Sequence, residues 1–578
     1  MNIIPEKERE ALKELETKIE GSIPEISELE RYRLGYNELD GHIIGLSLFS
    51  CGLSDIPAII DSLSHLKEIY LRGNNLNSIP DELCSLPNLK TLDLSENRLK
   101  EIPESIKSLL TLNELHLESN NLEILPDSIG NLTSLELLDL SENELTNLPP
   151  SLGNLFKLKT LDLSRNDILE LPESIGNLNS LEILYLGNNK LNNLPESIGL
   201  LSSLKRRNLR NNNLVTLPET IGDLKSLTSL FLKDNILKSL PSSIGKLPCL
   251  KYLGLSSNQI NSIPITIGSL SSLENLSISS NKLLELPASI GSLKKLLRLE
   301  ISDNRLKSLP DSIGGLSSLK ILRCDRNQLT IIPDSIGNLS FLESIKFDNN
   351  SLTILPDSIG QLKRLKELSL YDNKIENLPE SIGEVSSLEI LDLSKNKLTR
   401  LPESIGSLDS LIELDISTNK ITYIPPSIGA LPLIKSLILG FNRISEIPKT
   451  IGFLTTLEIL DLGKNRLSYI PETIGSLTSL KHLYLYYNEL NSVPESIGSL
   501  HTLKYLYLGN NKLTTLPDSI GRLKSLKFLF LRGNFLTELP ESLETLPSLK
   551  YLNIEKNNLK GYLDFVHKLE LKGIKILK

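Results

Sequence analysis

One asparagine position, repeated along most of the chain, constrains the fold of this sequence more than any other feature. Asn recurs every 23 residues from position 74 to position 557, and Cys51 holds the same place one repeat earlier. A Pro follows six residues after each of these positions, from 57 to 540, and a Gly fills a third series from 130 to 521. No insertion interrupts these series, so a chain of 578 residues is a stack of equal units rather than several globular domains.

The repeating unit has the pattern LxxLxLxxNxLxxLPxxIGxLxx, as in residues 135–149. Side chains alternate along a strand, so the two Leu of LxL point inward and their neighbours point outward. Each unit therefore contributes one short strand to a long parallel sheet, and the Pro begins a short helical turn behind it. We predict an α/β solenoid, a horseshoe with a concave parallel sheet and a short helical or irregular convex side. No unit buries enough apolar surface alone, so neighbours stabilise one another.

The repeated polar and small residues have separate structural roles. The Asn amide has two donors and an acceptor, which satisfy backbone groups where the chain leaves the strand. We expect Cys51 to replace Asn there through weak hydrogen bonds. The repeated Gly allows neighbouring turns to pack closely.

The ends of the stack require caps. Residues 6–20 place Ala11, Leu12, Leu15 and Ile19 at helical spacing, and a turn at residues 40–41 leads to the first strand, residues 43–48. At the other end we expect a helix over residues 562–571 and an edge strand over residues 574–577. The predicted domains are therefore an N-terminal helical cap (1–42), a solenoid of about 23 rungs (43–560) and a C-terminal cap (561–578).

Composition and charge exclude several classes of protein. The net charge is −9 and charged residues make up 23% of the chain, so no basic footprint for nucleic acid is present. The first twenty residues carry charges throughout, unlike a secretory signal, and no apolar run is long enough to insert into a membrane. The four Cys are widely spaced, without a zinc-binding or disulfide pattern. These features predict a cytoplasmic protein.

The 23-residue form with LPxSIGxL resembles the Ras-group leucine-rich repeat proteins. The resemblance extends over roughly residues 43–560 through the Leu, Asn, Pro, Ile and Gly positions. It implies protein binding on the concave face, commonly in signalling linked to small GTPases. The phosphatase-docking tail of some relatives is not found, and the nearest match, residues 345–347, lies inside a repeat.

The outward strand positions, which the scaffold leaves free to vary, become aromatic in the last four repeats. Aromatic residues make up only 4% of the chain, and such rings are common at binding hot spots. We predict a partner-binding patch made of His482, Tyr484, Tyr486, Tyr505, Tyr507, Phe528, Phe530 and Tyr551. The alternative is that the rings only stack on one another and stabilise this end of the sheet.

A second departure is Arg207, which stands where other full repeats have Leu or Ile. A buried, unpaired guanidinium is costly, so we expect Arg207 to reach solvent, find a partner or distort its repeat. With Arg206 and Arg210 it would form a secondary basic notch for a carboxylate or phosphate. The alternative is a local defect that a long array tolerates.

Catalytic and metal-binding patterns are not found. The six His are scattered without a ligand spacing, and a phosphate-binding loop is missing, so we expect no enzyme activity, no cofactor and no metal.

Upstream of the aromatic positions, the outward strand positions from Glu68 to Asp162 are mainly acidic. The sequence thus predicts a non-enzymatic scaffold that binds a protein partner on its concave face. The sequence does not determine the oligomeric state, and a monomer is favoured. The resemblance to the Ras-group proteins implies a small GTPase or its regulator as the partner. The alternative is a pattern-recognition module for peptides or glycans.

Overall fold

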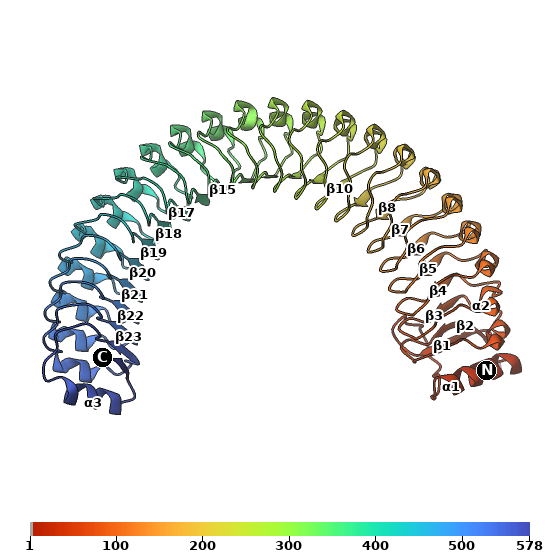
Figure 1. The fold of residues 1–578 in the computed structure, drawn as a ribbon, viewed down its shortest axis with the longest axis horizontal. Coiled ribbons are helices and arrows are strands. Elements are labelled where there is room, and N and C mark those ends of the chain that lie inside the picture. The colour runs from red at the N-terminus through yellow and green to blue at the C-terminus, as the bar shows by residue number, and fades with distance from the viewer. Residues whose placement is uncertain (1–3) are drawn as a thin grey trace. The chain divides into compact units, whose positions relative to one another are not determined.

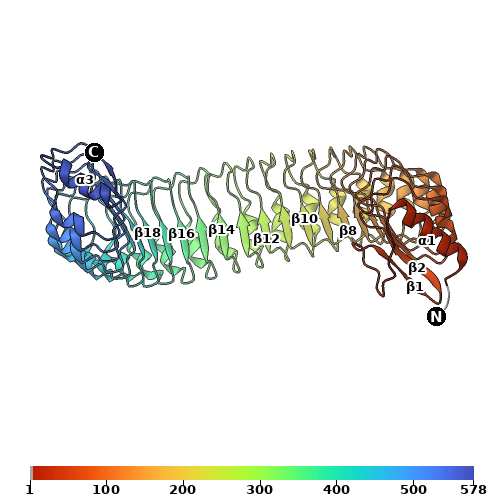
Figure 2. The same ribbon diagram turned by 90° about the horizontal axis from the view of Figure 1, so that it is seen from below.

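The computed structural model describes residues 4–578 and divides the chain into two compact units, Met1–Leu283 and Leu284–Lys578. Each unit is a stack of rungs, and most rungs contribute one three-residue strand and one short 3-10 turn. Within each unit the strands lie along the inner edge and the helical turns along the outer edge (Figure 1), and Figure 2 shows the strands side by side. The predicted α/β solenoid is confirmed.

In its described residues, 4–283, the first unit contains two α-helices, twelve strands and nine 3-10 turns. The α-helices and strands are α1 (Glu6–Lys18), β1 (Gly35–Leu39), β2 (His42–Ser47), β3 (Glu68–Tyr70), α2 (Asp81–Cys84), β4 (Thr91–Asp93), β5 (Glu114–His116), β6 (Leu137–Asp139), β7 (Thr160–Asp162), β8 (Ile183–Tyr185), β9 (Arg206–Asn208), β10 (Ser229–Phe231), β11 (Tyr252–Gly254) and β12 (Asn275–Ser277). The 3-10 turns are η1 (Ala58–Ser62), η2 (Glu104–Ser108), η3 (Asp127–Asn131), η4 (Pro150–Asn154), η5 (Glu173–Asn177), η6 (Glu196–Leu200), η7 (Glu219–Asp223), η8 (Ser242–Lys246) and η9 (Ile265–Ser269).

The second unit continues the same alternation and ends in one α-helix and one further strand. Its strands and α-helix are β13 (Arg298–Glu300), β14 (Ile321–Arg323), β15 (Ser344–Lys346), β16 (Glu367–Ser369), β17 (Ile390–Asp392), β18 (Glu413–Asp415), β19 (Ser436–Ile438), β20 (Ile459–Asp461), β21 (His482–Tyr484), β22 (Tyr505–Tyr507), β23 (Phe528–Phe530), β24 (Tyr551–Asn553), α3 (Leu563–Leu571) and β25 (Lys575–Leu577). Its 3-10 turns are η10 (Ala288–Ser292), η11 (Asp311–Gly315), η12 (Asp334–Asn338), η13 (Asp357–Gln361), η14 (Glu380–Glu384), η15 (Glu403–Ser407), η16 (Pro426–Ala430), η17 (Lys449–Phe453), η18 (Glu472–Ser476), η19 (Glu495–Ser499), η20 (Asp518–Arg522) and η21 (Glu541–Thr545).

The N-terminal region contains the predicted helix and one strand that the sequence analysis missed. In α1, Ala11, Leu12 and Leu15 are buried as predicted, and Ile19 lies just beyond the helix, half-exposed. Strand β1 pairs antiparallel with β2, and the predicted turn at residues 40–41 joins them as a hairpin. Both turn residues have positive φ, which is the geometry of a two-residue hairpin loop with Asp-Gly.

At the C-terminus, α3 and β25 match the predicted helix and edge strand to within one residue at each end. Strand β25 pairs in parallel with β24 and so continues the sheet of the second unit. Among residues 4–578, every helix is too short or too polar to cross a membrane.

The core of each unit is made of the inward Leu and Ile side chains. Successive strands pair in parallel at an offset of 23 residues, so equal positions of neighbouring rungs lie side by side. Leu506 and Leu529, the central residues of β22 and β23, are 0% exposed. Outward residues of the same strands are therefore presented in columns that run across the sheet.

The predicted asparagine ladder is confirmed, and Asn189 shows its contacts. Its Nδ2 donates to the carbonyl oxygens of Leu163, at 2.9 Å, and Leu186, at 3.2 Å, and its Oδ1 accepts from the amide of Ile168 at 3.0 Å. Cys51 replaces Asn as expected, because its Sγ donates weakly to a carbonyl oxygen at 3.5 Å. Buried backbone groups at each turn are thus satisfied by one side chain.

The repeated Pro and Gly fix the return path of each rung. The expectation that Pro is the first helical residue is wrong for most rungs: Pro126 has φ −73° and ψ 152°, extended values, and precedes the turn η3. Proline still suits this place, because its ring fixes φ near the observed value. A Cβ at Gly130 would collide with the backbone carbonyl of Ser151 on the next rung, which confirms that Gly permits close packing.

Candidate partner-binding site

The eight residues of the aromatic patch come together on the sheet of the second unit. His482, Tyr505, Phe528 and Tyr551 are register partners on β21 to β24 and form one column. Tyr484, Tyr507 and Phe530 form a second column at the other outward position of the same strands. The 23-residue period therefore brings together side chains that are up to 69 residues apart in sequence.

The rings of the first column stack face to face. The centroid of the Tyr505 ring lies 4.5 Å from that of the His482 ring, with 8° between the ring planes. It lies 4.8 Å from the centroid of the Phe528 ring, with 2° between the ring planes. Tyr551 ends the column in a tilted arrangement, 6.2 Å from Phe528. Both faces of Tyr505 are consequently covered by other rings.

The second column has the same arrangement. The Tyr507 ring lies 4.8 Å from Tyr484 and 4.2 Å from Phe530, with planes 23° and 6° apart. Tyr551 contacts this column as well, with its ring 5.1 Å from that of Phe530. Tyr551 thus joins the two columns at one end of the aromatic patch.

Tyr486 extends the patch beyond the strand. Its ring lies edge-on to Tyr484 at 6.5 Å and covers Gly463, where a Cβ would collide with it. Burial is the main cause that raises the pKa values of Tyr484, Tyr486 and Tyr507 above their usual range, so these phenols stay neutral and can donate hydrogen bonds at physiological pH.

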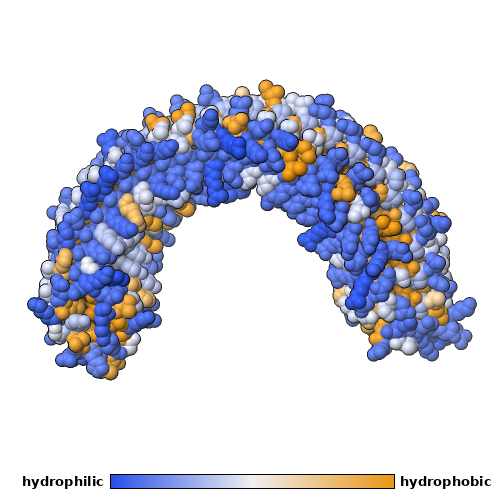
Figure 3. Space-filling model, viewed as in Figure 1, coloured by the Kyte–Doolittle hydropathy of each residue, from blue (hydrophilic) through white to orange (hydrophobic). Residues whose placement is uncertain are grey.

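All eight patch residues are half-buried, neither tucked under the sheet nor free in solvent. Since stacking covers both ring faces of Tyr505 and Tyr507, these two side chains expose ring edges and hydroxyl groups. The edge of an aromatic ring carries the positive part of its quadrupole. On the view in Figure 3 the surface is largely hydrophilic, and hydrophobic residues appear in separate groups.

A run of lysines that was not predicted from the sequence borders the aromatic patch. Each lysine immediately precedes a strand of the first column. In the last three of them, the backbone amide donates to the carbonyl oxygen of the lysine one repeat earlier, at 2.8 or 2.9 Å. This lysine column consists of Lys481, Lys504, Lys527 and Lys550.

The lysine column is mostly unpaired. Lys481 forms an ion pair with Glu458 at 2.6 Å, whereas in residues 4–578 no ion pair is found for the other three lysines. Burial, followed by the charges of Lys504 and Lys481, lowers the pKa of His482 below its usual range. In earlier repeats the position of these lysines holds both acidic and basic residues, as in the ion pair of Lys159 with Glu136. The C-terminal rungs therefore present a local excess of positive charge.

The predicted basic notch exists in part. A cavity of about 380 Å³ lies over β8 to β11, lined by Tyr185, Arg206, Arg207, Asn208, Arg210, Ser229, Phe231 and Tyr252. The exposed guanidinium of Arg210 lies 4.7 Å above the Phe231 ring, and Arg206 is also exposed.

The expectation that Arg207 reaches solvent, finds a partner or distorts its repeat is wrong, and the alternative of a local defect in the array remains. Its side chain is 0% exposed, and none of its three guanidinium nitrogens has a hydrogen-bond partner in the described part of the chain. Strand β9 still pairs with both neighbouring strands, so the backbone keeps the register of the repeat. This register directs the side chain of residue 207 inward. Burial lowers the pKa of Arg207 to about 9, so it remains charged at neutral pH. Its charge therefore faces the core and not the notch.

The acidic outward positions of the first unit are partly neutralised. Arg31 pairs with Asp93, and Arg72 pairs with Glu118. Burial raises the pKa values of Glu118 and Asp162. The negative surface expected there is accordingly smaller than the sequence suggests.

Two of the histidines expected to be scattered lie together in the first unit, beside Glu8. His42 and His65 are 23 residues apart, one full repeat, and this spacing was the signal that could have revealed them.

Comparisons with known proteins agree with this architecture. A family profile described as "Leucine-rich repeat region" matches residues 50–149, 141–231, 205–280, 242–330, 313–392, 357–441 and 488–575, and one described as "Leucine rich repeat" matches residues 432–490. A search of curated proteins gives no match.

Several solved structures are similar over most of the chain. The plant peptide hormone receptor RGFR1 in complex with RGF2 is 31% identical, with a TM-score of 0.65 and 89% of each chain covered. The Arabidopsis receptor kinase HAESA, solved with the peptide hormone IDA and the co-receptor SERK1, is 28% identical, with a TM-score of 0.62 and 95% of this chain and 93% of that chain covered. A leucine-rich repeat protein of Leptospira interrogans is 31% identical, with a TM-score of 0.52 and 77% and 96% covered.

The fold is that of a protein–protein interaction module. The strand register, the asparagine ladder and the family profiles lead to one conclusion: this chain belongs to the leucine-rich repeat family.

Proposed function

We propose that this protein is a non-enzymatic scaffold that binds an extended, acidic segment of a partner protein on the sheet of its second unit. One observation carries the proposal: two columns of stacked rings lie beside a run of lysines that are mostly without acidic partners. The rings supply contact area that loses little side-chain entropy on binding, since stacking already orders them. The lysines select a partner of opposite charge.

The dimensions of the aromatic patch fit a short peptide. The columns cross four strands, which at ~4.8 Å per strand gives a length of roughly 15 Å. An extended chain rises about 3.3 Å per residue, so roughly four or five residues would lie along the patch. Carboxylates and carbonyl oxygens of that segment would meet the positive ring edges, the tyrosine hydroxyls and the lysine column.

The orientation of the rings favours a peptide over a glycan. Sugar rings pack on exposed aromatic faces, but the faces of Tyr505 and Tyr507 are covered on both sides by neighbouring rings. Similar structures that carry peptide ligands, such as RGFR1 with RGF2, give further support to a peptide ligand.

We propose the class of partner from the family resemblance and the cellular location from the composition. Resemblance to the Ras-group proteins makes a small GTPase, or one of its regulators, the first macromolecular partner to test. Four widely spaced cysteines without a disulfide pattern support a cytoplasmic location. We propose that the protein acts there as a monomer.

A displayed library of random peptides tests the proposal. Selection on the wild-type protein is expected to enrich acidic sequences whose binding falls at least tenfold in the variant Tyr484→Ala, Tyr507→Ala, Phe530→Ala. A matched control removes three rings of the second unit that are outside the patch: Tyr423, Phe453 and Tyr469, exposed by 52%, 74% and 44%. Enriched peptides that bind the patch variant and the wild type equally would contradict the proposal.

The lysine column has its own test. Replacing Lys504 and Lys527 with Glu is expected to abolish binding of the acidic peptides, and binding to the wild type should weaken as salt increases. The exposed Lys449 and Lys524, replaced in the same way, give the control. Peptides that are neutral or basic, and indifferent to salt, would rule out an acidic partner.

A further inference from the structure

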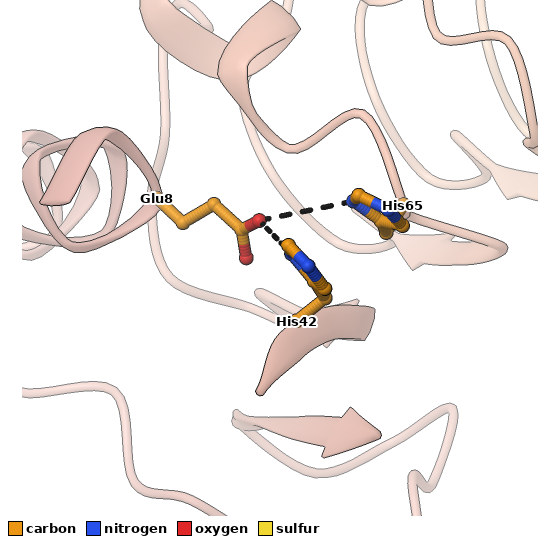
Figure 4. Close-up of side chains that lie close together, drawn as sticks. All are labelled: Glu8, His42 and His65. Carbon is orange, nitrogen blue, oxygen red and sulfur yellow. Dashed lines mark hydrogen bonds and ion pairs between the residues drawn. The ribbon is translucent and has the colours of Figure 1, made fainter. Parts of the chain in front are cut away.

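We propose that Glu8, His42 and His65 form a binding site for a divalent transition-metal ion, Zn²⁺ in particular, in the first unit. One ligand atom of each residue lies within 4.8 Å of the other two. Figure 4 shows the Glu8 carboxylate directed toward both imidazoles. The residues come from α1, from the start of β2 and from the loop before β3.

The repeat itself places the two histidines. Strands β2 and β3 pair in parallel with Gly45 opposite Glu68, and the same 23-residue offset sets His42 beside His65. Their rings stack with 3.7 Å between centroids and 21° between planes. Two imidazoles held in parallel present equivalent nitrogens to the same side.

The helix α1 supplies the third ligand. Glu8 is 3% exposed, although charged residues are rarely buried without a partner. Its Oε2 accepts from the backbone amide of Ile43 at 2.9 Å, and its Oε1 accepts from Nδ1 of His42 at 2.7 Å. Nδ1 of His65 lies 3.9 Å from the same Oε1. The carboxylate is therefore oriented by the backbone and keeps one oxygen directed at both rings.

The set of donors suits zinc. Imidazole nitrogen and carboxylate oxygen bind Zn²⁺ at about 2.0–2.2 Å, which places neighbouring ligand atoms roughly 3.3 Å apart in a tetrahedral site. Because the two ring planes are only 21° apart, both imidazoles must turn about their side-chain torsions for their nitrogens to point at one ion. The two imidazole side chains are 36% and 49% exposed, so an ion can enter and water can complete its coordination.

The backbone bond to Glu8 would act as an outer support that orients this ligand. An ion held by the three residues would link the N-terminal helix to the first two rungs. Metal binding of this kind stabilises the folded state, since the ligands are not assembled in the unfolded chain.

Titration of Zn²⁺ into the metal-free, full-length protein, followed by calorimetry and thermal unfolding, tests the site. One ion is expected to bind and to raise the midpoint of unfolding. His65→Ala should weaken Zn²⁺ binding at least tenfold, and its half-exposed position makes it the variant least expected to disturb the fold. Glu8→Gln keeps the shape of the side chain and should also lose affinity.

Two controls separate this site from other donors. His501→Ala removes an exposed histidine of the second unit, and Cys249→Ser removes the exposed thiol; both variants should bind Zn²⁺ like the wild type. Co²⁺ should give visible absorption bands of a low-symmetry site in the wild type and not in His65→Ala. Failure of the wild type to bind Zn²⁺, or equal binding by wild type, His65→Ala and Glu8→Gln, would overturn the proposal.

Discussion

The ring of Tyr507 lies parallel to the ring of Phe530, with 4.2 Å between centroids and 6° between planes. The two residues are register partners on β22 and β23, so backbone pairing sets the distance between them. The ring contact stabilises adjacent rungs and at the same time presents ring edges outward. Stability and binding therefore depend on the same side chains, and experiments must measure both.

A double-mutant cycle on Tyr507→Ala and Phe530→Ala measures the stacking contact. We expect a coupling free energy of about 0.5–1.5 kcal/mol in urea unfolding, as found for other aromatic pairs. Tyr423 and Phe530 lie on different rungs without ring contact and give the control cycle, with coupling near zero. Additive effects of Tyr507→Ala and Phe530→Ala would contradict the stacked arrangement.

Stability should depend on pH through His482. Burial and two nearby lysines lower its pKa in the folded state, so the unfolded chain binds the proton more readily. Its contribution is therefore complete above about pH 6.5 and is lost as the pH falls through the lowered pKa. His482→Phe keeps a ring in the column but does not titrate. Between pH 7.5 and pH 5 the wild type should lose more free energy of unfolding than this variant; equal losses would disprove the effect.

Arg207→Leu should stabilise the protein. The substitution removes a buried charge without a partner and restores the apolar residue of the repeat, so the free energy of unfolding should rise by on the order of 3 kcal/mol. Arg206→Leu, on the exposed side of the same strand, is the control and should change it by less than about 0.5 kcal/mol. Chemical denaturation compares the free energies of unfolding of the two variants with that of the wild type. A less stable Arg207→Leu variant would show that the guanidinium has a stabilising partner.

Asn189→Ala tests the asparagine ladder. The substitution removes the partner of two carbonyl groups and one amide, all buried, and should cost roughly 3 kcal/mol of unfolding free energy. The exposed Asn193→Ala, four residues later, should be nearly neutral. Similar small losses of unfolding free energy in both variants would mean that water forms the hydrogen bonds of Asn189 in its place.

Features that follow the 23-residue period were predictable from the sequence. The strands, the asparagine ladder and the columns of the aromatic patch all arise because equal positions of successive rungs are neighbours. The terminal helices were predictable from local spacing, since α1 buries Ala11, Leu12 and Leu15 as expected.

Features that depend on three-dimensional detail were not predictable. The residue before each ladder Asn adopts a left-handed conformation. Its φ is near 55° where it is not Gly, as at Glu142 and Phe441, and is 72° and 75° at Gly73 and Gly533. Its identity varies, so no sequence signal marks it. Ring orientation in the aromatic patch is set by side-chain torsions, and the approach of Glu8 to His42 joins a cap helix to a strand. Neither the ring orientation nor the contact of Glu8 with His42 follows from the 23-residue period.

Photochemical cross-linking from the aromatic patch tests the central claim most directly. A photoreactive phenylalanine analogue placed at Tyr507 keeps a ring in the column, and the same analogue at Tyr423 reports on an exposed position outside the patch. On irradiation with a peptide selected on the wild type, we predict a covalent adduct at position 507 and little at position 423. Adducts at position 423 without any at position 507 would contradict binding at the aromatic patch.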